Sequence, residues 1–179
     1  MVLDLPVSSS FCAIPMSSLA DYTCPGLLIP RLQSRTAALV IRELCGVMEL
    51  EGRLEEPLPF CQAVIKREEL SSTATTSGWA LPHARGPGVL QLSFALGFAV
   101  EPLIWFANAS SRVHTVFLFA VPENEISGYL SLISGLARLS READLMNRLR
   151  CCTSQESMFE ALRLIQLVKP QAATMKNSS

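Results

Sequence analysis

Histidine and charge are both scarce in this chain of 179 residues. Only His83 and His114 are present, and Asp, Glu, Lys and Arg together make up 17% of the sequence. Two histidines cannot form a histidine-rich metal site, although one is enough for nucleophilic or acid–base chemistry. The 15 basic and 16 acidic residues give a net charge of −1, so no basic excess exists to neutralise nucleic-acid phosphates. We therefore expect neither a metal centre nor nucleic-acid binding.

Targeting segments and cysteine motifs are missing as well. The first 30 residues contain no lysine or arginine, whereas a secretory signal peptide begins with a positive segment. The longest apolar stretches, residues 89–100 and 113–121, are about half of the roughly 20 residues that cross a bilayer. The six cysteines form no CxxC pair, and Cys45 and Cys61 lie on apolar helix faces. We expect a cytoplasmic protein with reduced thiols and no membrane insertion.

The length fits one domain with terminal tails, because domains commonly hold about 100–200 residues. Residues 1–25 are rich in serine and proline and show no sustained period, which predicts an irregular or partly ordered N-terminal arm. Residues 26–168 carry the periodic segments and form the expected domain. Residues 169–179 have no apolar period and predict a flexible C-terminal tail.

Five segments repeat apolar residues at helical spacing. They are residues 34–52, 57–69, 126–140, 141–150 and 153–165. Ser34 is the expected N-cap of the first segment, and Pro57 suits the first turn of the second. Thr153 and Glu156 match a capping box at the start of the last segment. Two predicted helices therefore precede the central region and three follow it.

The central region, with one short segment before the first helix, reads as β-strand. The expected strands are residues 27–29, 79–83, 89–100, 104–106 and 113–121, with a turn over residues 108–112. Pro82 cannot donate to a β-ladder, so we expect His83 at a strand end or at an edge. Helices before and after a group of strands predict an α/β (α+β) fold, a mixed β-sheet flanked by helices on both faces in a single domain.

The stretch from Arg67 to His83 holds residue types suited to phosphate chemistry. Arginine binds phosphate oxygens through two parallel hydrogen bonds, and the hydroxyl-rich loop of residues 71–78 offers backbone amides and the hydroxyls of Ser72 and Thr73. A neutral imidazole is a competent nucleophile towards a phosphoryl group. Each feature also has an ordinary structural explanation, namely a surface ion pair, a plain loop and a structural histidine.

Separated pieces of this region resemble one family. They are residues 63–68 (Ala-Val-Ile-Lys-Arg-Glu), Ser72-Thr73, Gly78, residues 80–83 (Ala-Leu-Pro-His) and residues 116–122. The series is similar to the enzyme IIA domain of the mannitol/fructose class in the bacterial phosphoenolpyruvate-dependent sugar phosphotransferase system, including its nitrogen-regulatory members. The resemblance runs over residues 27–168. It implies a mixed sheet flanked by helices, and a histidine that takes phosphate from the histidine-containing phosphocarrier protein and passes it on.

The resemblance also implies roles for individual residues. By position, His83 is the phosphorylated nucleophile and Arg67 the phosphate clamp. The residues that would bind or support the phosphate are Ser72, Thr73, Glu68 and Tyr129. No metal or organic cofactor is implied, because the incoming group is already activated. The implied partners are the phosphocarrier protein, followed by a IIB transporter component or a regulatory target protein.

Two features depart from the family pattern. The loop of residues 71–78 lacks most glycines of the usual Gly-Ser-Thr-Gly-x-Gly-x-Gly form, and glycine is what allows close backbone approach to an anion. Tyr129 stands where many members carry a second histidine, and a tyrosine donates a hydrogen bond but carries no positive charge at neutral pH. His114 does not fill that place, so we interpret it as a strand-end structural histidine. We interpret Trp79 and Trp105 as packing residues.

We predict a phosphocarrier or regulatory IIA-type protein that accepts phosphate on His83. Since no fused transporter region or sugar pocket is visible, a regulatory role is favoured over sugar uptake, although a stand-alone carrier for transport also fits. One alternative is a descendant of this domain that has lost phosphotransfer and only binds proteins; the altered loop and Tyr129 motivate it, while Arg67 and His83 argue against it. Another is a hydrolase with His83 as general base, which lacks a GxSxG motif and whose nearby carboxylates, Glu68 and Glu69, can equally be solvated.

Overall fold

The computed structural model describes residues 17–106 and 108–167. Residues 1–16 of the expected arm and residues 169–179 of the expected tail lie outside this part. Residues 17–25, which we assigned to the arm, are ordered. They form β1 (Ser17–Ser18), the 3-10 helix η1 (Leu19–Tyr22) and the start of a second 3-10 helix, η2 (Pro25–Leu27). Leu19 is fully buried, so the folded unit includes the end of the arm.

A mixed sheet forms the centre of the molecule. Its strands are β2 (Leu28–Leu32), β3 (Trp79–Ala80), β4 (His83–Gly86), β5 (Ser93–Trp105) and β6 (Asn108–Pro122). The order is β2-β5-β6-β3, and β4 also pairs with β6. The β5–β6 pair is antiparallel and the other pairs are parallel. β1 pairs with β7 (Gln166–Leu167) in a separate two-stranded sheet.

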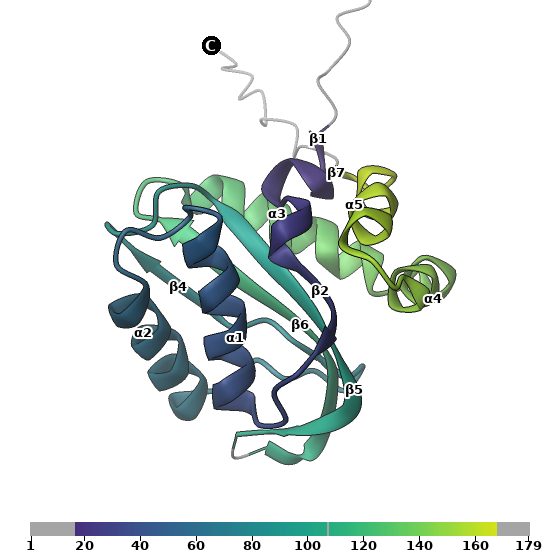
Figure 1. Cartoon of the computed structure of the whole chain (residues 1–179), viewed down its shortest axis with the longest axis horizontal. Helices are drawn as coiled ribbons and strands as arrows, with labels where there is room; N and C mark the ends of the chain where they lie inside the picture. Colours follow the sequence, from purple (N-terminus) through teal and green to yellow (C-terminus); the bar gives the residue numbers. More distant parts are fainter. Residues whose placement is uncertain (1–16, 107, 168–179) are drawn as a thin grey trace, which may run out of the picture.

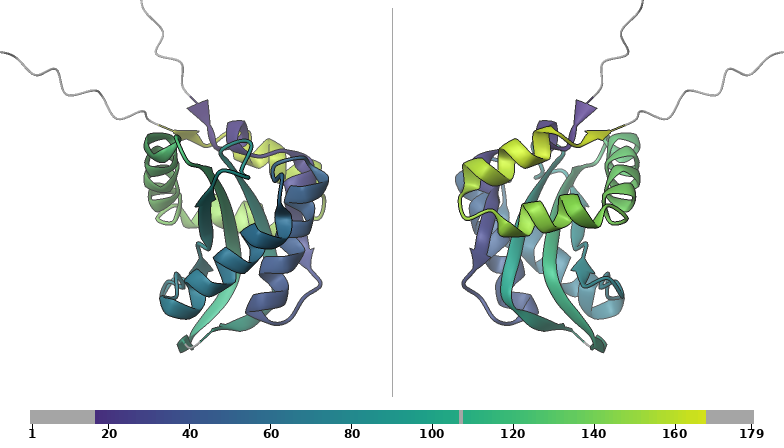
Figure 2. Two further views of the ribbon diagram at one scale, coloured as in Figure 1. Left: turned by 90° about the vertical axis from the view of Figure 1, so that its left-hand side faces the viewer. Right: turned by 90° about the vertical axis from the view of Figure 1, so that its right-hand side faces the viewer.

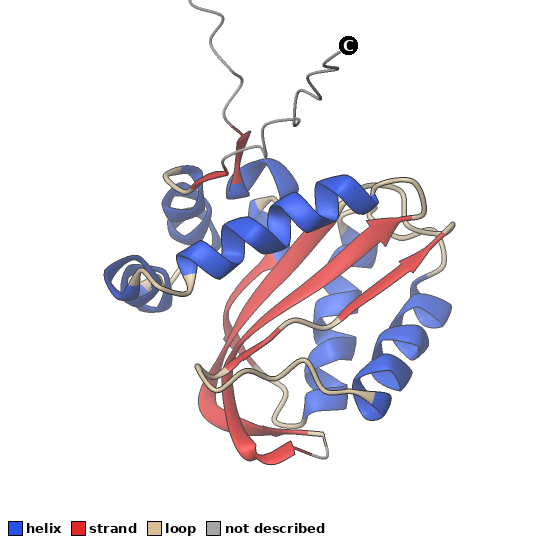
Figure 3. Ribbon diagram, turned by 180° about the vertical axis from the view of Figure 1, so that it is seen from behind, coloured by secondary structure: helices blue, strands red, loops and turns tan. Residues whose placement is uncertain are grey.

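Helices cover both faces of the sheet, as predicted. They are α1 (Ala37–Leu50) and α2 (Pro57–Leu70) on one face, and α3 (Ile126–Leu139), α4 (Ala143–Cys151) and α5 (Gln155–Arg163) on the other. Figure 1 shows α1 and α2 in front of the sheet. Figure 3 gives the view from the opposite side, where α3 crosses in front of the strands. The side views in Figure 2 show the sheet between the two layers. Each layer has its own buried apolar core.

Two helix starts differ from the prediction. The N-cap of α1 is Thr36 instead of Ser34. At α5 the N-cap is Ser154, whose hydroxyl accepts a hydrogen bond from the Ser157 backbone N–H at 3.2 Å. The predicted capping box that begins at Thr153 is therefore wrong by one residue. At α5, neighbouring hydroxyl residues offer equivalent acceptors for the free amides of the first turn, so the sequence alone does not select between them. At α1 the Thr36 side chain makes no capping hydrogen bond.

The hairpin of β5 and β6 is longer than predicted. We expected a separate strand over residues 104–106 and a turn over residues 108–112, but β5 continues to Trp105 and β6 begins at Asn108. Leu103 pairs with Val113 after a shift in register. Such an irregularity lets the strands continue past residues that break the apolar alternation. The extension brings the buried Trp105 against α2, where its indole N–H donates to Glu68.

The buried cysteines behave as the sequence predicts. Cys45 of α1 and Cys61 of α2 are both buried and free. The hydrogen bond with Cys61, together with burial, raises the pKa of the Cys45 thiol, so this thiol stays protonated at neutral pH. Among the helices of the described residues, none has both the length and the apolar character needed to cross a membrane.

Candidate functional site

His83 begins strand β4, at the edge of the main sheet. It pairs in register with Phe119 of β6, and the carbonyl of Pro82 accepts the Phe119 backbone N–H at 2.9 Å. Pro82 has no N–H of its own, and the pairing with β6 that β3 begins resumes in β4 only at this point. The predicted position of His83 at a strand end and edge is confirmed. Its imidazole is half-buried and lies beside the ring of Tyr129, with 5.6 Å between the ring centres.

One hydrogen bond determines which nitrogen of His83 can act as a nucleophile. Nδ1 lies 3.0 Å from the backbone carbonyl oxygen of Leu81. A carbonyl oxygen only accepts, so Nδ1 must carry the proton. The neutral ring then keeps its free lone pair on Nε2. Leu81 precedes a proline, whose tertiary amide offers no competing N–H to this region.

Tyr129 lies beside the histidine, and Arg67 lies within electrostatic reach of Tyr129. Arg67 lies in the last turn of α2 and donates from Nη1 to the carbonyl oxygen of Ser71; a cation is favourable at this end of a helix. Burial raises the pKa of the Tyr129 hydroxyl, and the charge of Arg67 partly opposes this shift. The hydroxyl therefore stays protonated at neutral pH and remains a hydrogen-bond donor. α3 thus brings Tyr129 to His83 of β4, and Arg67 of α2 lies close enough for its charge to act on Tyr129.

Glu68 is buried, contrary to the interpretation that solvent can hold it. Only 1% of the residue is exposed. Its Oε2 accepts from the Thr73 backbone N–H at 3.0 Å, from the Thr73 hydroxyl at 2.9 Å and from the Trp105 indole N–H at 2.8 Å. The sequence does hold a signal for this position, because Glu68 follows Val64 by four residues and so lies on the buried stripe of α2. Glu69 is exposed.

Hydroxyl groups organise the loop of residues 71–78. The Ser72 hydroxyl accepts from the Ala74 N–H at 3.2 Å, and the Thr75 hydroxyl accepts from the Trp79 N–H at 3.1 Å. The Thr73 hydroxyl donates to Glu68 and accepts from the Leu81 N–H at 3.0 Å. Side-chain bonds therefore fix a loop in which most glycines of the family pattern are missing.

Gly78 is the loop residue that needs glycine. Its φ is +79°, a conformation that other residues adopt only with strain. The ring of His114 and the carbonyl of Arg112 lie where a side chain would begin. The Gly78 carbonyl also accepts from the His114 N–H at 2.9 Å. His114 therefore holds the loop, and its contacts support a structural role. The expected position at a strand end is wrong, because β6 begins at Asn108 and His114 lies inside the strand.

His114 is not brought to the site of His83. It precedes Thr115, which pairs with Trp79, whereas His83 pairs with Phe119 further along β6. Burial lowers the pKa of His114, with a further contribution from the charge of Arg150. The neutral ring is thus the form that the fold favours.

We expect His114 to make the fold less stable in acid. The unfolded chain takes up a proton on this ring near the ordinary pKa of 6.5, whereas the folded chain takes it up only at lower pH. The unfolding free energy therefore falls as the pH drops below about 6.5. Urea unfolding of the wild type and of His114→Asn between pH 7.5 and 5 measures this difference. Equal pH dependence in both proteins would contradict the prediction.

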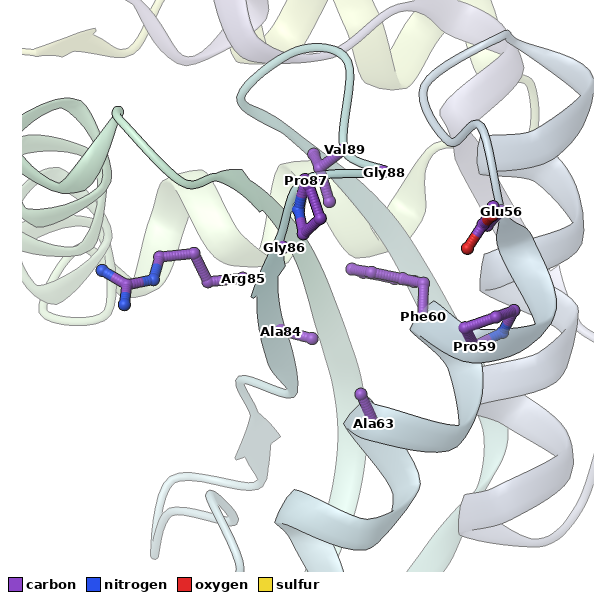
Figure 4. A pocket seen from close by; sticks show the side chains of 10 residues that line it. All are labelled: Glu56, Pro59, Phe60, Ala63, Ala84, Arg85, Gly86, Pro87, Gly88 and Val89. Atoms are coloured by element: carbon purple, nitrogen blue, oxygen red, sulfur yellow. The ribbon is translucent and has the colours of Figure 1, made fainter.

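Next to the site, a hollow of about 470 Å³ lies between α2 and the end of β4. Figure 4 shows Phe60 and Ala84 facing this hollow and Arg85 pointing away from it. Because side chains alternate along a strand, Arg85 shares the face of His83 and the hollow belongs to the opposite face. Arg85 is not among the predicted site residues, although its spacing of two residues from His83 is a sequence signal for a shared face. Trp79 and Trp105 are buried, as predicted.

Known proteins resemble this chain in sequence and in fold. The family model for "Phosphoenolpyruvate-dependent sugar phosphotransferase system, EIIA 2" matches residues 26–164. A nitrogen regulatory protein of Bradyrhizobium diazoefficiens is 25% identical over 147 residues, which cover 82% of this chain and 95% of that protein.

Solved structures show the same fold. The crystal structure of the nitrogen regulatory protein IIA-Ntr from Neisseria meningitidis superimposes with a TM-score of 0.67 and 23% identity, over 80% of this chain and 98% of that one. The IIA component in a complex of Escherichia coli enzyme IIAMtl with phosphorylated IIBMtl gives a TM-score of 0.64 and 20% identity, over 76% of this chain and 94% of that chain.

Proposed function

Because the chain belongs to the EIIA 2 family of the phosphoenolpyruvate-dependent sugar phosphotransferase system, we propose that it is a phosphocarrier that accepts a phosphoryl group on His83. The observation that carries this proposal is the hydrogen bond between Nδ1 of His83 and the Leu81 carbonyl. It leaves a lone pair on Nε2 of a half-exposed ring. Tyr129 lies beside this ring, and the charge of Arg67 reaches Tyr129 from α2.

In the proposed reaction, neutral His83 attacks the phosphorus of a phosphohistidine on a donor protein. The new bond forms at Nε2, and the bond between phosphorus and the donor nitrogen breaks with its electron pair returning to the donor ring. The Nδ1 proton stays in its hydrogen bond to Leu81. Since the transition state spreads negative charge over the phosphoryl oxygens, the site has mainly to position these atoms and to stabilise charge.

The proposed phosphate contacts come from Arg67, Tyr129, Ser72 and the loop amides. A guanidinium forms strong charge-assisted hydrogen bonds with phosphate oxygens, and the protonated Tyr129 hydroxyl adds a neutral donor. The single hydroxyl proton of Thr73 is already donated to Glu68. We therefore assign Thr73 and Glu68 to support of the site, and Ser72 to the phosphate.

The proposed partners are other proteins. We infer that the histidine-containing phosphocarrier protein is the donor, and that a IIB component or a regulatory target protein is the acceptor, in the cytoplasm. Near the site, Leu70 is 78% exposed and Leu130, which follows Tyr129, is 60% exposed. Exposed apolar residues around a reactive group fit brief docking with a protein surface. The match to a full-length nitrogen regulatory protein favours the regulatory use of the phosphate.

Phosphoryl transfer can be tested directly. The full chain is incubated with phosphoenolpyruvate, the general phosphotransfer enzyme and the histidine phosphocarrier, and phosphate on the protein is measured by intact mass. We expect one phosphoryl group that is labile in acid and stable in base, as for a phosphoramidate. A IIA protein of known activity serves as the positive control. Failure to label this chain while the control is labelled would favour the alternative, a protein-binding module that has lost phosphotransfer.

Arg67→Ala is expected to slow phosphoryl uptake about 10- to 100-fold. The loss corresponds to charge-assisted hydrogen bonds of about 1.5–3 kcal/mol that form with the transferring group. Tyr129→Phe is the milder comparison, because it removes one neutral hydrogen bond and should cost about fivefold. Rapid-quench measurement of the labelling rate gives both values. If Arg67→Ala is labelled at the wild-type rate, Arg67 does not bind the transferring phosphate and its proposed role is wrong.

A further inference from the structure

A continuous set of hydrogen bonds leads from the protein interior to His83. The indole N–H of Trp105 donates to Oε2 of Glu68, and the Thr73 hydroxyl donates to the same oxygen. The Thr73 oxygen in turn accepts the Leu81 backbone N–H at 3.0 Å. The Leu81 carbonyl accepts the Nδ1 proton of His83 at 3.0 Å. The five residues come from the ends of α2 and β5, from the loop after α2, and from the segment that leads into β4.

We propose that Trp105 and Glu68 are positioning residues for His83, and that they act through Thr73 and Leu81 to keep the imidazole proton on Nδ1. The kinetic consequence rests on the function proposed above. The effect on the proton does not, because it concerns the resting protein.

Glu68 acts on Leu81 by fixing the position of Thr73. Leu81 lies in the short segment between β3 and β4, and its N–H is bonded to the Thr73 side chain. The N–H and the carbonyl of Leu81 lie in different peptide planes, but Leu81 precedes Pro82, which confines its backbone to the extended region. Holding the N–H therefore also limits the direction of the carbonyl. Glu68 holds Thr73 by both its backbone N–H and its hydroxyl. The Leu81 carbonyl therefore points at Nδ1 only while Thr73 stays in this position.

Trp105 holds the carboxylate. Both residues are almost completely buried, and an ionised or polar group in such a place is stable only when hydrogen-bonded. The indole N–H is one of three donors that converge on Oε2, whereas Oε1 has no partner among the described residues. All of the known support for the carboxylate therefore comes from Trp105 and Thr73.

Imidazole nitrogen chemical shifts test the proposal without any phosphoryl transfer. Long-range proton–nitrogen correlation spectra of the full, tag-free chain at pH 8 report which nitrogen of each histidine is protonated. The chain has only His83 and His114, and His114 contacts Thr115 instead of this network, so it serves as an internal reference. We expect His83 to be protonated mainly on Nδ1, and His114 to be unaffected by changes in the network.

Thr73→Val and Trp105→Phe interrupt the network at two points. Thr73→Val keeps the side-chain shape and removes the hydroxyl, and we expect it to increase the Nε2–H to Nδ1–H ratio of His83 more than threefold. Trp105→Phe removes one of three donors and should have a smaller effect in the same direction. Thr73→Ser, which keeps the hydroxyl, should retain the wild-type ratio. In labelling assays, Thr73→Val should slow phosphoryl uptake about 10- to 100-fold, as misplaced reacting groups do.

The outcomes separate positioning from simple packing. If Thr73→Val and Trp105→Phe lower the unfolding free energy but leave the His83 proton on Nδ1, the residues only support the fold and the proposal is overturned. The proposal also fails if Thr73→Ser shifts the proton as much as Thr73→Val. If the ratio shifts as expected while the wild type accepts no phosphate, positioning stands and the proposed function fails.

Discussion

A protein in which His83 is replaced by alanine is expected to take up no phosphoryl group. The label on the full chain should fall to background under conditions that phosphorylate the wild type completely. Alanine has no lone pair to attack phosphorus, and the neighbouring hydroxyl of Tyr129 stays protonated because burial raises its pKa. Ser72 and Tyr129, the hydroxyl residues assigned to the phosphate, are weak nucleophiles without an adjacent base, so we expect neither to replace the imidazole at neutral pH.

His114→Ala is the matched control for this experiment, since it removes the other histidine of the chain. This variant should still be phosphorylated, because the His114 ring of the wild type lies at Gly78 and not beside His83. Urea unfolding of both variants checks that each is folded at the assay temperature. Label that survives in His83→Ala and disappears in His114→Ala would move the reaction to the other histidine. Acid-stable label in His83→Ala would indicate a hydroxyl acceptor instead.

The setting of His83 follows from local chemistry, which is why the sequence predicts it. Pro82 lacks the N–H that a central strand needs, so a residue next to it belongs at an edge. Arg67 is equally local, because the helical period after Pro57 carries it to the last turn of α2. The layers are also accessible from the sequence, since helical periods flank the strands. These features depend on neighbours within a few residues.

The contacts that hold the histidine in place are of another kind. Trp105 and Glu68 are 37 residues apart in the chain, and they meet only because β5 runs on to Trp105. The apolar alternation weakens in the second half of that strand, so the sequence indicated a break there. The hydroxyl bonds of the loop are local, but several hydroxyl residues compete for the same amides. A pattern of residue types does not decide such competition, whereas packing does.

Adding a side chain at position 78 is expected to destabilise the fold strongly. Gly78→Ala is expected to lower the unfolding free energy by about 2–4 kcal/mol, from left-handed backbone strain of about 1–2 kcal/mol and from overpacking. The new Cβ would lie 2.7 Å from Cδ2 of His114 and 2.9 Å from the Arg112 carbonyl oxygen. The carbonyl belongs to β6 and cannot move without disturbing its pairing with Ile104. Urea unfolding at pH 7.5 measures the loss.

Gly52→Ala separates the backbone strain from the overpacking, because it measures the backbone strain alone. Gly52 has a similar φ of +63°, but a Cβ there would meet no atom within 4 Å. It should therefore lose only the backbone part, about 1–2 kcal/mol. The same Gly78→Ala change made in His114→Ala should cost less than in the wild type, because one of the two obstacles is gone.

Equal losses for Gly52→Ala and Gly78→Ala would mean that the His114 ring does not set the shape of the loop. If the loop is shaped by this contact, the losses differ, and phosphoryl uptake by folded Gly78→Ala slows as Ser72 and Thr73 are displaced.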